Sequence, residues 1–315
     1  MISQSDKNTK KFQTHPEKNT NIFMIYKLKN GGIMQKICAG IVTYHPQISD
    51  LRKNIQSIFK QVDKVIIVDN GSDNFSFISR CIAEISPKIY IIRNLKNAGI
   101  AKALNQLCEY AEKNGYEWIL TLDQDTCCPE RLICEFLNYK ADNVAIISPN
   151  IIYRHNESYA DYSSRGIHEV DWAITSGSFT KIKAWRSVDG FDEKLFIDAV
   201  DRDFGIRVKR KGYRILKDYN ITIFHELGNL KCRKIFGRTI YVTNHSKIRK
   251  YYMARNAIYL DKKLGIHYSA VYILKLVLKT LLFEEKKMSK LGAIIKGFSD
   301  GRKMRKSIEK QNNEK

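Results

Sequence analysis

The chain has 315 residues, of which 43% are hydrophobic, and this suffices for one large core or two small domains. With modest glycine and proline contents it is neither collagenous nor fully disordered, no apolar run reaches the roughly 18 residues needed to span a bilayer, and residues 1–20 are too polar for a signal peptide. The formal net charge is +21, and the last 85 residues hold 22 basic against 6 acidic side chains, so this part is expected to meet an anionic partner (nucleic acid, lipid or phosphate) or to expose a solvated basic face.

Residues 1–35 are rich in lysine, asparagine and glutamine and have no sustained periodicity, which predicts a disordered extension. An alternative is that they are not translated. The codons of Gly31 and Gly32 can form a purine-rich ribosome-binding sequence, and the folded pattern begins directly after Met34.

Strands and helices then alternate along the chain. Short apolar runs predict strands at 37–43, 64–68, 89–92, 118–122 and 144–147, and helical spacing of apolar residues predicts helices over 49–62 and 100–111. This rhythm is typical of a mainly parallel sheet with helices on both sides, in which ligands bind at the carboxyl ends of the strands. Residues 150–230 are expected to mix loops, short strands and one helix near 200–211, and the chain becomes basic and helical from about 231.

Two carboxylates, Asp123 and Asp125, follow the strand at 118–122 in the sequence LTLDQD. Carboxylates two residues apart at a strand terminus can approach one hard divalent cation, and a metal that bridges a diphosphate would stabilise it as a leaving group. The alternative is an ordinary turn, which favours aspartate in any case. The position after a buried strand favours the metal site.

Polar residues also follow two other strands. Asp69 in VDNGS can accept a hydrogen bond from a pyrimidine imide N–H, or it belongs to a turn with Asn-Gly chemistry. In NAGIAKALN, Gly99 permits close backbone approach before a helix whose N-terminus favours phosphate, and the alternative is a helix capped by Asn97.

The segment FIDAVDRDF places Asp198, Asp201 and Asp203 beside apolar residues. Asp198 and Asp201 are three residues apart, so a helical turn would put them on one face, and one of them could be a general base for a hydroxyl group. The alternative is a helix N-terminus, where the dipole favours acids, and this explains Asp198 better than Asp203. His225 in IFHELG is either a structural histidine or, with its acidic companions, a metal ligand.

As an ordered set, these segments resemble glycosyltransferase family 2 over roughly residues 36–262. The segments are TYHP at 43–46, VDNGS at 68–72, NAGIAKALN at 97–105, LDQD at 122–125, TSGS at 175–178, GFDEKLFIDAVDRDFGIR at 190–207, FHELG at 224–228 and YYMARNAIYL at 251–260. The FIDxVDxDF form and the late RN pair are similar to the rhamnosyltransferase branch. The resemblance implies the α/β GT-A nucleotide-diphospho-sugar transferase fold, here with a basic helical C-terminal extension.

The resemblance also implies an inverting single displacement from a nucleoside diphosphate sugar, with Mg²⁺ or Mn²⁺ as cofactor. The implied donor-binding residues are Thr43, Asp69, Asn97, Gly99, Lys102 and Asp123, the metal ligands are Asp123, Asp125 and His225, and the acceptor-binding residues are Trp172, Ser176 and Gly177. Asp201 matches the second residue of the family's Glu-Asp base motif. The first residue is Val200 here, a departure that leaves Asp198 as an alternative base.

The implied division of the chain is a nucleotide-sugar-binding half at 36–125, an acceptor-binding and catalytic half at 126–230, and a basic helical segment at 231–315. The implied activity is transfer of a sugar, L-rhamnose from dTDP-rhamnose, to a cell-surface polysaccharide acceptor carried on polyprenyl diphosphate, as in O-antigen or cell-wall synthesis. The alternatives are a UDP-sugar-dependent galactofuranosyl- or glucosyltransferase and a nucleic-acid-binding protein. Aromatic residues are not interleaved with the basic ones, which disfavours nucleic acid.

The expected location is the cytoplasmic face of a bacterial cell membrane. Seven cysteines without a CxxC pair indicate reduced thiols in the cytosol. Apolar residues recur at helical spacing in 270–283, at Val271, Leu274, Leu278, Leu281 and Leu282. Flanked by Tyr272 and Lys275, they predict an amphipathic helix that lies on an anionic membrane surface, and the alternative is a helix packed on the catalytic part.

Overall fold

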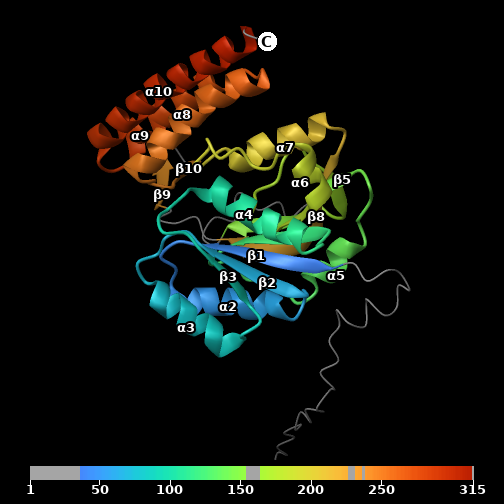
Figure 1. Ribbon diagram of the computed structural model, residues 1–315. Coiled ribbons are helices and arrows are strands. Elements are labelled where there is room, and N and C mark those ends of the chain that lie inside the picture. Colours follow the sequence, from blue (N-terminus) through green and yellow to red (C-terminus); the bar gives the residue numbers. More distant parts are fainter. Residues whose placement is uncertain (1–35, 154–163, 226–230, 236–237, 314–315) are drawn as a thin grey trace, which may run out of the picture.

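The computed structural model describes residues 36–153, 164–225, 231–235 and 238–313, so the expectations for residues 1–35 lie outside the described part. Its centre is an eight-stranded sheet in the order β3-β2-β1-β4-β7-β5-β8-β6 (Figure 1). The strands are β1 (Ile37–Thr43), β2 (Lys64–Asp69), β3 (Tyr90–Arg93), β4 (Trp118–Asp123), β5 (Val144–Tyr153), β6 (Ile167–Glu169), β7 (Ser178–Lys181) and β8 (Arg214–His225).

The two halves of the sheet differ in strand direction. Neighbours among β3, β2, β1 and β4 are all parallel, as the alternation of strands and helices predicts. In the other half, β7 runs antiparallel to β4 and β5, β6 runs antiparallel to β8, and β5 and β8 are parallel. The predicted α/β fold is confirmed. No strand bounds were predicted after 144–147, so β6, β7 and β8 are additions, and the four residues of β7 are too few to establish a period.

Helices cover both faces of the sheet. The helices α2 (Ile48–Phe59), α3 (Phe75–Ile85) and α5 (Leu132–Leu137) pack with one core cluster, and α4 (Ile100–Lys113), α6 (Ile182–Ser187) and α7 (Val200–Arg210) pack with the other. In β1, Ile37 and Ile41 belong to the first cluster and Cys38 and Val42 to the second. This is the two-residue period of a strand that is buried on both faces.

The C-terminal segment begins with a hairpin and continues with three helices. Strands β9 (Lys231–Ile235) and β10 (Arg238–Val242) are antiparallel, and they are followed by α8 (Lys247–Leu264), α9 (Ser269–Phe283) and α10 (Lys287–Asn313). The helical prediction is therefore wrong for 231–242, where the run RTIYV is rich in β-formers, and right beyond it. Within the described residues, no helix combines the length and apolar character that a membrane span requires.

The three helices are joined to the part of the molecule that contains the sheet and to one another. Tyr259, Leu260 and Leu264 of α8 belong to the core cluster that α4 and α7 share. Glu284 accepts hydrogen bonds from Lys250 of α8 and Lys290 of α10, and all three residues are buried. Figure 1 shows α8, α9 and α10 on the α4 and α7 side of the sheet, at the upper left of the molecule in that view.

Candidate active site

Three predicted site residues end neighbouring parallel strands. Thr43 closes β1 and lies in register with Asp69 at the end of β2, and Val42 is in register with Asp123 at the end of β4. The Thr43 hydroxyl donates to Asp69 Oδ1 at 3.3 Å, and the Ser72 N–H donates to Oδ2 at 3.2 Å. Asp69 is fully buried, and these contacts fix the orientation of its carboxylate.

An asparagine network organises the next loop. Asn70 Nδ2 donates to Asn97 Oδ1 at 3.0 Å, and Asn70 Oδ1 accepts from the Ala98 N–H at 3.0 Å. Asn97 Oδ1 also accepts from the Gly99 N–H at 2.9 Å. Asn70 was missed by the sequence reasoning, although it stands in the VDNGS segment beside Asp69.

The start of α4 is occupied by protein backbone. Gly99 has φ +88°, and a Cβ added there would lie 2.6 Å from the carbonyl oxygen of Phe196. The Ile100 N–H donates to that same oxygen at 2.7 Å. The close approach that Gly99 permits is therefore that of Phe196, and the phosphate expected at this helix N-terminus would find the Ile100 N–H already engaged. Lys102 pairs with Glu193 at 3.1 Å, and both side chains are about half exposed.

A pocket of about 550 Å³ lies beside Asp123. It brings together five predicted residues, Asp123, Trp172, Ser176, Asp198 and Asp201, and four residues from the C-terminal helical segment, Arg249, Met253, Tyr268 and Tyr272. The sequence reasoning assigned no site role to this second group, whose first member, Arg249, follows Asp201 by 48 residues. The pocket is thus closed by helices from the end of the chain.

Ser176 and Gly177 shape the turn that carries Asp123. The Asp123 N–H donates to Ser176 Oγ at 3.0 Å, and Ser176 Oγ lies 2.8 Å from Thr126 Oγ1. The Gly177 N–H donates to Thr121 O at 2.8 Å, and Gly177 has φ +79°, which favours glycine. Ser176 also faces the pocket, whereas Gly177 does not appear among its lining residues.

Trp172 is the large apolar surface in this pocket. Its side chain is 45% exposed, and its Cβ packs over Gly205 of α7, where an added Cβ would lie 2.7 Å away. Gly205 therefore permits the close approach that holds Trp172 at the rim. A half-exposed indole at a pocket rim suits stacking on an organic ligand.

Asp198 lies in a strained turn that α8 supports. Asp198 and Ala199 have φ +66° and +65°, a left-handed conformation that costs non-glycine residues of order 1–3 kcal/mol each. Asn256 Nδ2 donates to the carbonyl oxygens of Ile197 at 2.8 Å and Asp198 at 2.9 Å. The Arg249 guanidinium binds both oxygens of the Asp198 carboxylate, at 3.0–3.2 Å. Strain of this kind persists where surrounding contacts impose it, and here those contacts come from α8.

Asp201 is the carboxylate best suited to accept a proton. Its pKa is raised to about 6, mainly by burial; the nearby carboxylates of Asp123 and Asp198 contribute to the rise, and a backbone hydrogen bond opposes it. Burial also raises the pKa of Asp198, opposed by Arg249. Asp203, by contrast, is fully buried and ion-paired with Arg207 at 2.6 Å and Lys263 at 2.7 Å, so its role is structural.

The predicted metal ligands are only partly described. Asp123 lines the pocket and Asp125 is exposed beside it, while the side chain of His225, at the end of β8, lies outside the described part. Among the described residues, no group of three or more histidine, cysteine or acidic side chains could hold a metal by itself. Two carboxylates completed by substrate phosphates are nevertheless a usual Mg²⁺ arrangement, and the strand-end position of this pair fits it.

Tyr268 and Tyr272 offer hydroxyl groups from the α9 side. Burial raises the pKa of Tyr268 to about 12 and also raises the pKa of Tyr272. Arg202 stacks over the Tyr268 ring at 4.0 Å. Both phenols therefore stay protonated at neutral pH and can donate hydrogen bonds to a ligand in the pocket.

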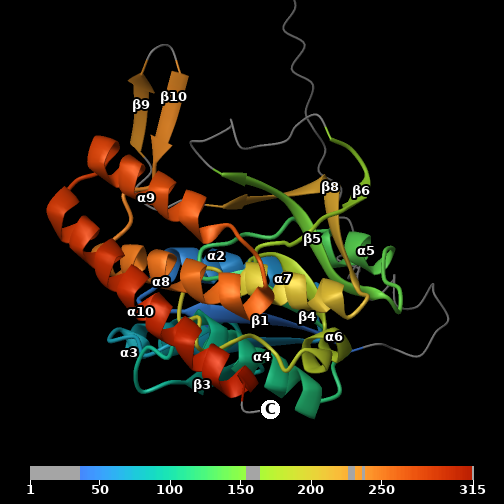
Figure 2. The same cartoon turned by 90° about the horizontal axis from the view of Figure 1, so that it is seen from above.

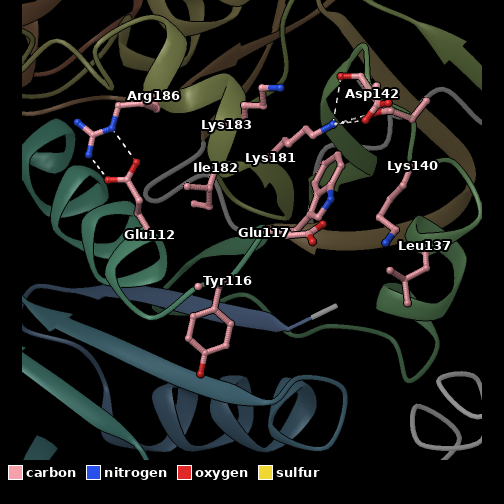
Figure 3. A pocket seen from close by; sticks show the side chains of 13 residues that line it. Glu112, Tyr116, Glu117, Leu137, Lys140, Asp142, Lys181, Ile182, Lys183 and Arg186 are labelled. Carbon is pink, nitrogen blue, oxygen red and sulfur yellow. Dashed lines mark hydrogen bonds and ion pairs between the residues drawn. The ribbon is translucent and has the colours of Figure 1, made fainter. Parts of the chain in front are cut away.

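A second pocket, of about 860 Å³, lies at the opposite end of β4 (Figure 3). It is lined by Trp118, the first residue of β4, and by charged side chains that mostly pair with one another, Arg186 with Glu112 and Lys181 with Asp142. Ligands of open α/β sheets bind at the carboxyl ends of the strands, and this pocket is at the amino end. The pocket at Asp123 is therefore the candidate active site.

Comparison with known proteins agrees with this assignment. Residues 38–211 match the profile of "Glycosyl transferase family 2". A dTDP-rhamnosyl transferase, RfbF of Shigella flexneri, is 31% identical over 243 residues, which cover 72% of this chain and 80% of RfbF.

Solved structures support the fold. The mannosyltransferase PcManGT from Pyrobaculum calidifontis, in complex with GDP-Man and Mn²⁺, has a TM-score of 0.52 and 14% identity, and the match covers 88% of this chain and 80% of that chain. GalNAc-T7 with UDP, GalNAc and Mn²⁺ has a TM-score of 0.51 and 9% identity, over 80% of this chain and 58% of that chain. At such identities the likeness establishes the GT-A fold alone.

Proposed function

The chain belongs to glycosyl transferase family 2 and is a glycosyltransferase, and we propose that it transfers L-rhamnose from dTDP-rhamnose to a lipid-linked cell-surface glycan. The observation that carries the donor is the similarity to RfbF, a dTDP-rhamnosyl transferase, along 72% of the chain. The acceptor is a growing polysaccharide on polyprenyl diphosphate, at the cytoplasmic face of the membrane.

In the proposed donor site, residues 36–125 bind the nucleotide. The buried Asp69 carboxylate accepts a hydrogen bond from the imide N–H of thymine, and Thr43 keeps that carboxylate oriented. Asn97 contributes through the loop that it shares with Asn70. Asp123, which links the nucleotide half to the pocket, faces the ribose or the sugar.

The proposed reaction is a single displacement with inversion. Asp201 takes the proton from the acceptor hydroxyl while the oxygen of that hydroxyl forms a bond to the anomeric carbon of the donor sugar. At the same time the bond between the anomeric carbon and the diphosphate oxygen breaks. A pKa of about 6 leaves Asp201 mostly ionised at neutral pH and still basic enough to accept a proton. Asp198 is the alternative base, and its bidentate contact with Arg249 favours a supporting role.

A divalent cation, Mg²⁺ or Mn²⁺, would supply charge stabilisation to the departing diphosphate. Asp123 and Asp125 would hold it, with His225 as a further ligand. Both structural neighbours named above contain Mn²⁺ with a nucleotide or nucleotide sugar, which supports the proposal.

Residues 126–230 form the proposed acceptor and catalytic half. Trp172 would stack on the acceptor sugar, and Ser176 would bind it while also holding the Asp123 turn. Gly177 would act through the conformation of that turn. Residues 231–315 would bring the protein to the anionic inner surface of the cell membrane as a peripheral protein.

A donor screen with the purified chain tests the function. Release of nucleoside diphosphate is measured with dTDP-rhamnose, UDP-galactofuranose, UDP-glucose and GDP-mannose, each with Mn²⁺ and an acceptor glycan. We expect turnover with dTDP-rhamnose at least about tenfold above the others, since discrimination by a few contacts is worth 1–3 kcal/mol. Preference for a UDP sugar would replace rhamnose by galactofuranose or glucose, and no turnover with any donor would refute the assignment.

A further inference from the structure

Helix α9 presents an apolar stripe to solvent. Its members are 42–62% exposed, and they are Val271, Leu274, Leu278, Leu281 and Leu282. At 3.6 residues per turn these positions fall on one side of the helix, and the buried residues Ser269, Leu276 and Thr280 fall on the opposite side. Five large apolar side chains on one exposed face form a patch of the kind that marks a contact with another apolar phase.

Helix α10 continues this patch. Val277 of α9 and Leu291 of α10 pack in one small cluster between the helices. Leu274 and Leu281 are each one turn from Val277, and Met288 and Ile295, which are 81% and 69% exposed, are each one turn from Leu291. The two exposed stripes therefore flank the same seam between α9 and α10.

The surroundings of the patch are basic. Helix α9 contains Lys275 and Lys279 and no acidic residue, and the turn into α10 exposes Lys286 and Lys287 beside one acid, Glu285. The β9–β10 hairpin, whose sequence carries two lysines and two arginines, projects beside α9 in both views (Figure 2). Apolar stripes flanked by lysine are typical of helices that lie in the interface of an anionic bilayer. A second copy of the chain packed on this patch would bring the positive charges of both copies together, and this repulsion disfavours a dimer through the patch.

The same helix also forms part of the active-site wall. Tyr272 lines the pocket together with Tyr268, directly before α9. Lys275 is exposed and lies one turn from Tyr272, from Val271 and from Leu278, between the pocket wall and the apolar stripe. A surface on which the stripe rests would therefore lie next to the pocket.

We propose that α9 is a two-faced helix whose stripe, with Met288 and Ile295 of α10, inserts into an anionic lipid surface while its other flank shapes the acceptor pocket. Lys275 then sits at the level of the lipid phosphates. The pocket receives its acceptor from the head-group layer, with the diphosphate of the lipid carrier close to the membrane. This last step rests on the proposed lipid-linked acceptor, whereas the lipid contact itself does not.

The test uses the full-length chain and vesicles of phosphatidylglycerol mixed with phosphatidylcholine, with pure phosphatidylcholine vesicles for comparison. The test variant is Leu274→Ser with Leu278→Ser. The control is Phe77→Ser, which removes an equally exposed apolar side chain (58%) from α3, on the other face of the sheet. Co-sedimentation gives the bound fraction, and thermal unfolding verifies that all three proteins are folded.

We expect the wild type and Phe77→Ser to bind anionic vesicles equally. The double variant should bind at least about tenfold more weakly, because two leucines no longer enter the interface. With acceptor in vesicles, the double variant should lose transfer to the same degree, while transfer to a lipid-free acceptor glycan in solution stays unchanged. Binding of dTDP, measured by calorimetry, should be equal in all three proteins.

Two results would overturn the inference: no binding of the wild type to anionic vesicles at low salt, or undiminished binding of the double variant. Sedimentation equilibrium adds a third. A dimer of the wild type that the double variant dissociates would make the patch an interface between copies. Failure of dTDP-rhamnose in the donor screen with intact vesicle binding would refute the proposed function and leave the lipid contact standing.

Discussion

Asp201 and Asp198 are three residues apart, line the same pocket and differ in what surrounds them. Two nitrogens of Arg249 donate hydrogen bonds to the Asp198 carboxylate, and Asn256 donates one to the backbone oxygen of the same residue. No ion pair is seen for Asp201 among the described residues, and its pKa is raised to about 6. Asp198 is thus suited to hold the turn, and Asp201 to exchange a proton.

Replacing Asp201 by asparagine should keep the shape of the site and remove its proton acceptor. We expect kcat to fall at least about 10²-fold with donor affinity retained. In the wild type, kcat/KM should decrease as the pH is lowered, with a midpoint near pH 6, because Asp201 becomes protonated there. Initial rates from pH 5 to 8 and calorimetric titration with dTDP measure both effects. An active Asp201→Asn together with an inactive Asp198→Asn would move the base to Asp198.

The same substitution should stabilise the fold at neutral pH. A folded-state pKa near 6 exceeds the unfolded value of about 3.9, so between these pH values the folded state binds more protons and stability falls as the pH rises. At pH 7 the wild type bears the full cost of this ionised carboxylate, and asparagine has none. We expect Asp201→Asn to gain about 1–2 kcal/mol at pH 7 and nothing at pH 3.5, measured by urea unfolding. An equal or lower stability at pH 7 would contradict the raised pKa.

Asp125 offers the sharpest test of the metal. It is exposed, so Asp125→Ala should leave the thermal midpoint unchanged while it lowers transfer about 10²-fold or more, through loss of charge stabilisation at the diphosphate. Glu130→Ala removes another exposed acid from the same loop; it is the control and should retain full activity. Activity that persists in Asp125→Ala, or in the wild type with excess EDTA, would remove the metal from the mechanism.

The pattern of strands pointed to Asp69 and Asp123, because the carboxyl ends of parallel strands meet at one edge of the sheet, and the family resemblance added Thr43 at the same edge. It did not find Arg249 or Tyr272, because their place at the pocket depends on how α8 and α9 fold back over the sheet. It also gave Gly99 a ligand where the structure has the Phe196 backbone. A glycine before a helix signals close approach without saying of what.

Among the elements, α10 lies along α8 at a distance that its glycines permit. A Cβ at Gly297 would lie 2.2 Å from Tyr251 O, and one at Gly301 would lie 2.6 Å from Arg255 O. Arg255 and Asn256 of the same α8 turn reach the loop at Lys194 and Ile197. The helix pair therefore supports the strained turn at Asp198 and Ala199.

Two glycine substitutions in α10 should have opposite effects. Gly297→Ala puts a methyl group against a backbone oxygen that cannot turn away, and we expect a loss of about 1–3 kcal/mol. Gly292→Ala is the matched control, since it has open space around it and should gain about 0.4–1 kcal/mol from reduced freedom of the unfolded chain. Thermal unfolding of both variants measures the difference. Equal midpoints would mean that α10 does not pack closely on α8 in solution.

Several periodic elements were predicted from the sequence, but the helix α3, the strands β6 and β7 and the hairpin of β9 and β10 were not. The helix at 100–111 carries its apolar face at every turn, and α4 spans Ile100–Lys113. Four-residue β7 has no room for a pattern, and in β9 and β10 the lysines and arginines hid the β-branched and aromatic residues. The basic composition of the whole C-terminal segment therefore led to a helical prediction, whereas the β-branched and aromatic residues of 238–242 favour a strand.

At the scale of the whole molecule, the chain builds one pocket from three stretches of sequence. The first contributes Asp123, the second Asp201 and the third Tyr272. The third stretch also carries most of the net charge, with 22 basic against 6 acidic residues after position 230. The C-terminal helices therefore contribute both to the wall of the pocket and to the excess of positive charge.

The net charge predicts that moderate salt stabilises the fold. With 54 basic and 33 acidic residues, 21 positive charges have no counterpart, and their mutual repulsion opposes the compact state. Salt also weakens surface ion pairs, but each of these contributes only about 0–1 kcal/mol. Raising the ionic strength from 0.01 to 0.1 M shortens the Debye length from about 30 to about 10 Å and screens the repulsion first, because it acts over longer distances than a contact pair.

We therefore expect the thermal midpoint to rise by about 2 °C or more between 0.01 and 0.15 M, equally in NaCl and KCl, as measured by differential scanning calorimetry. A midpoint that falls with salt would mean that ion pairs such as Lys263–Asp192 outweigh the repulsion. Screening should also release the protein from anionic vesicles at roughly 0.5 M salt, so vesicle binding and the thermal midpoint should be measured over the same salt series. A protein that leaves the vesicles while its midpoint rises has lost an electrostatic contact and kept its fold.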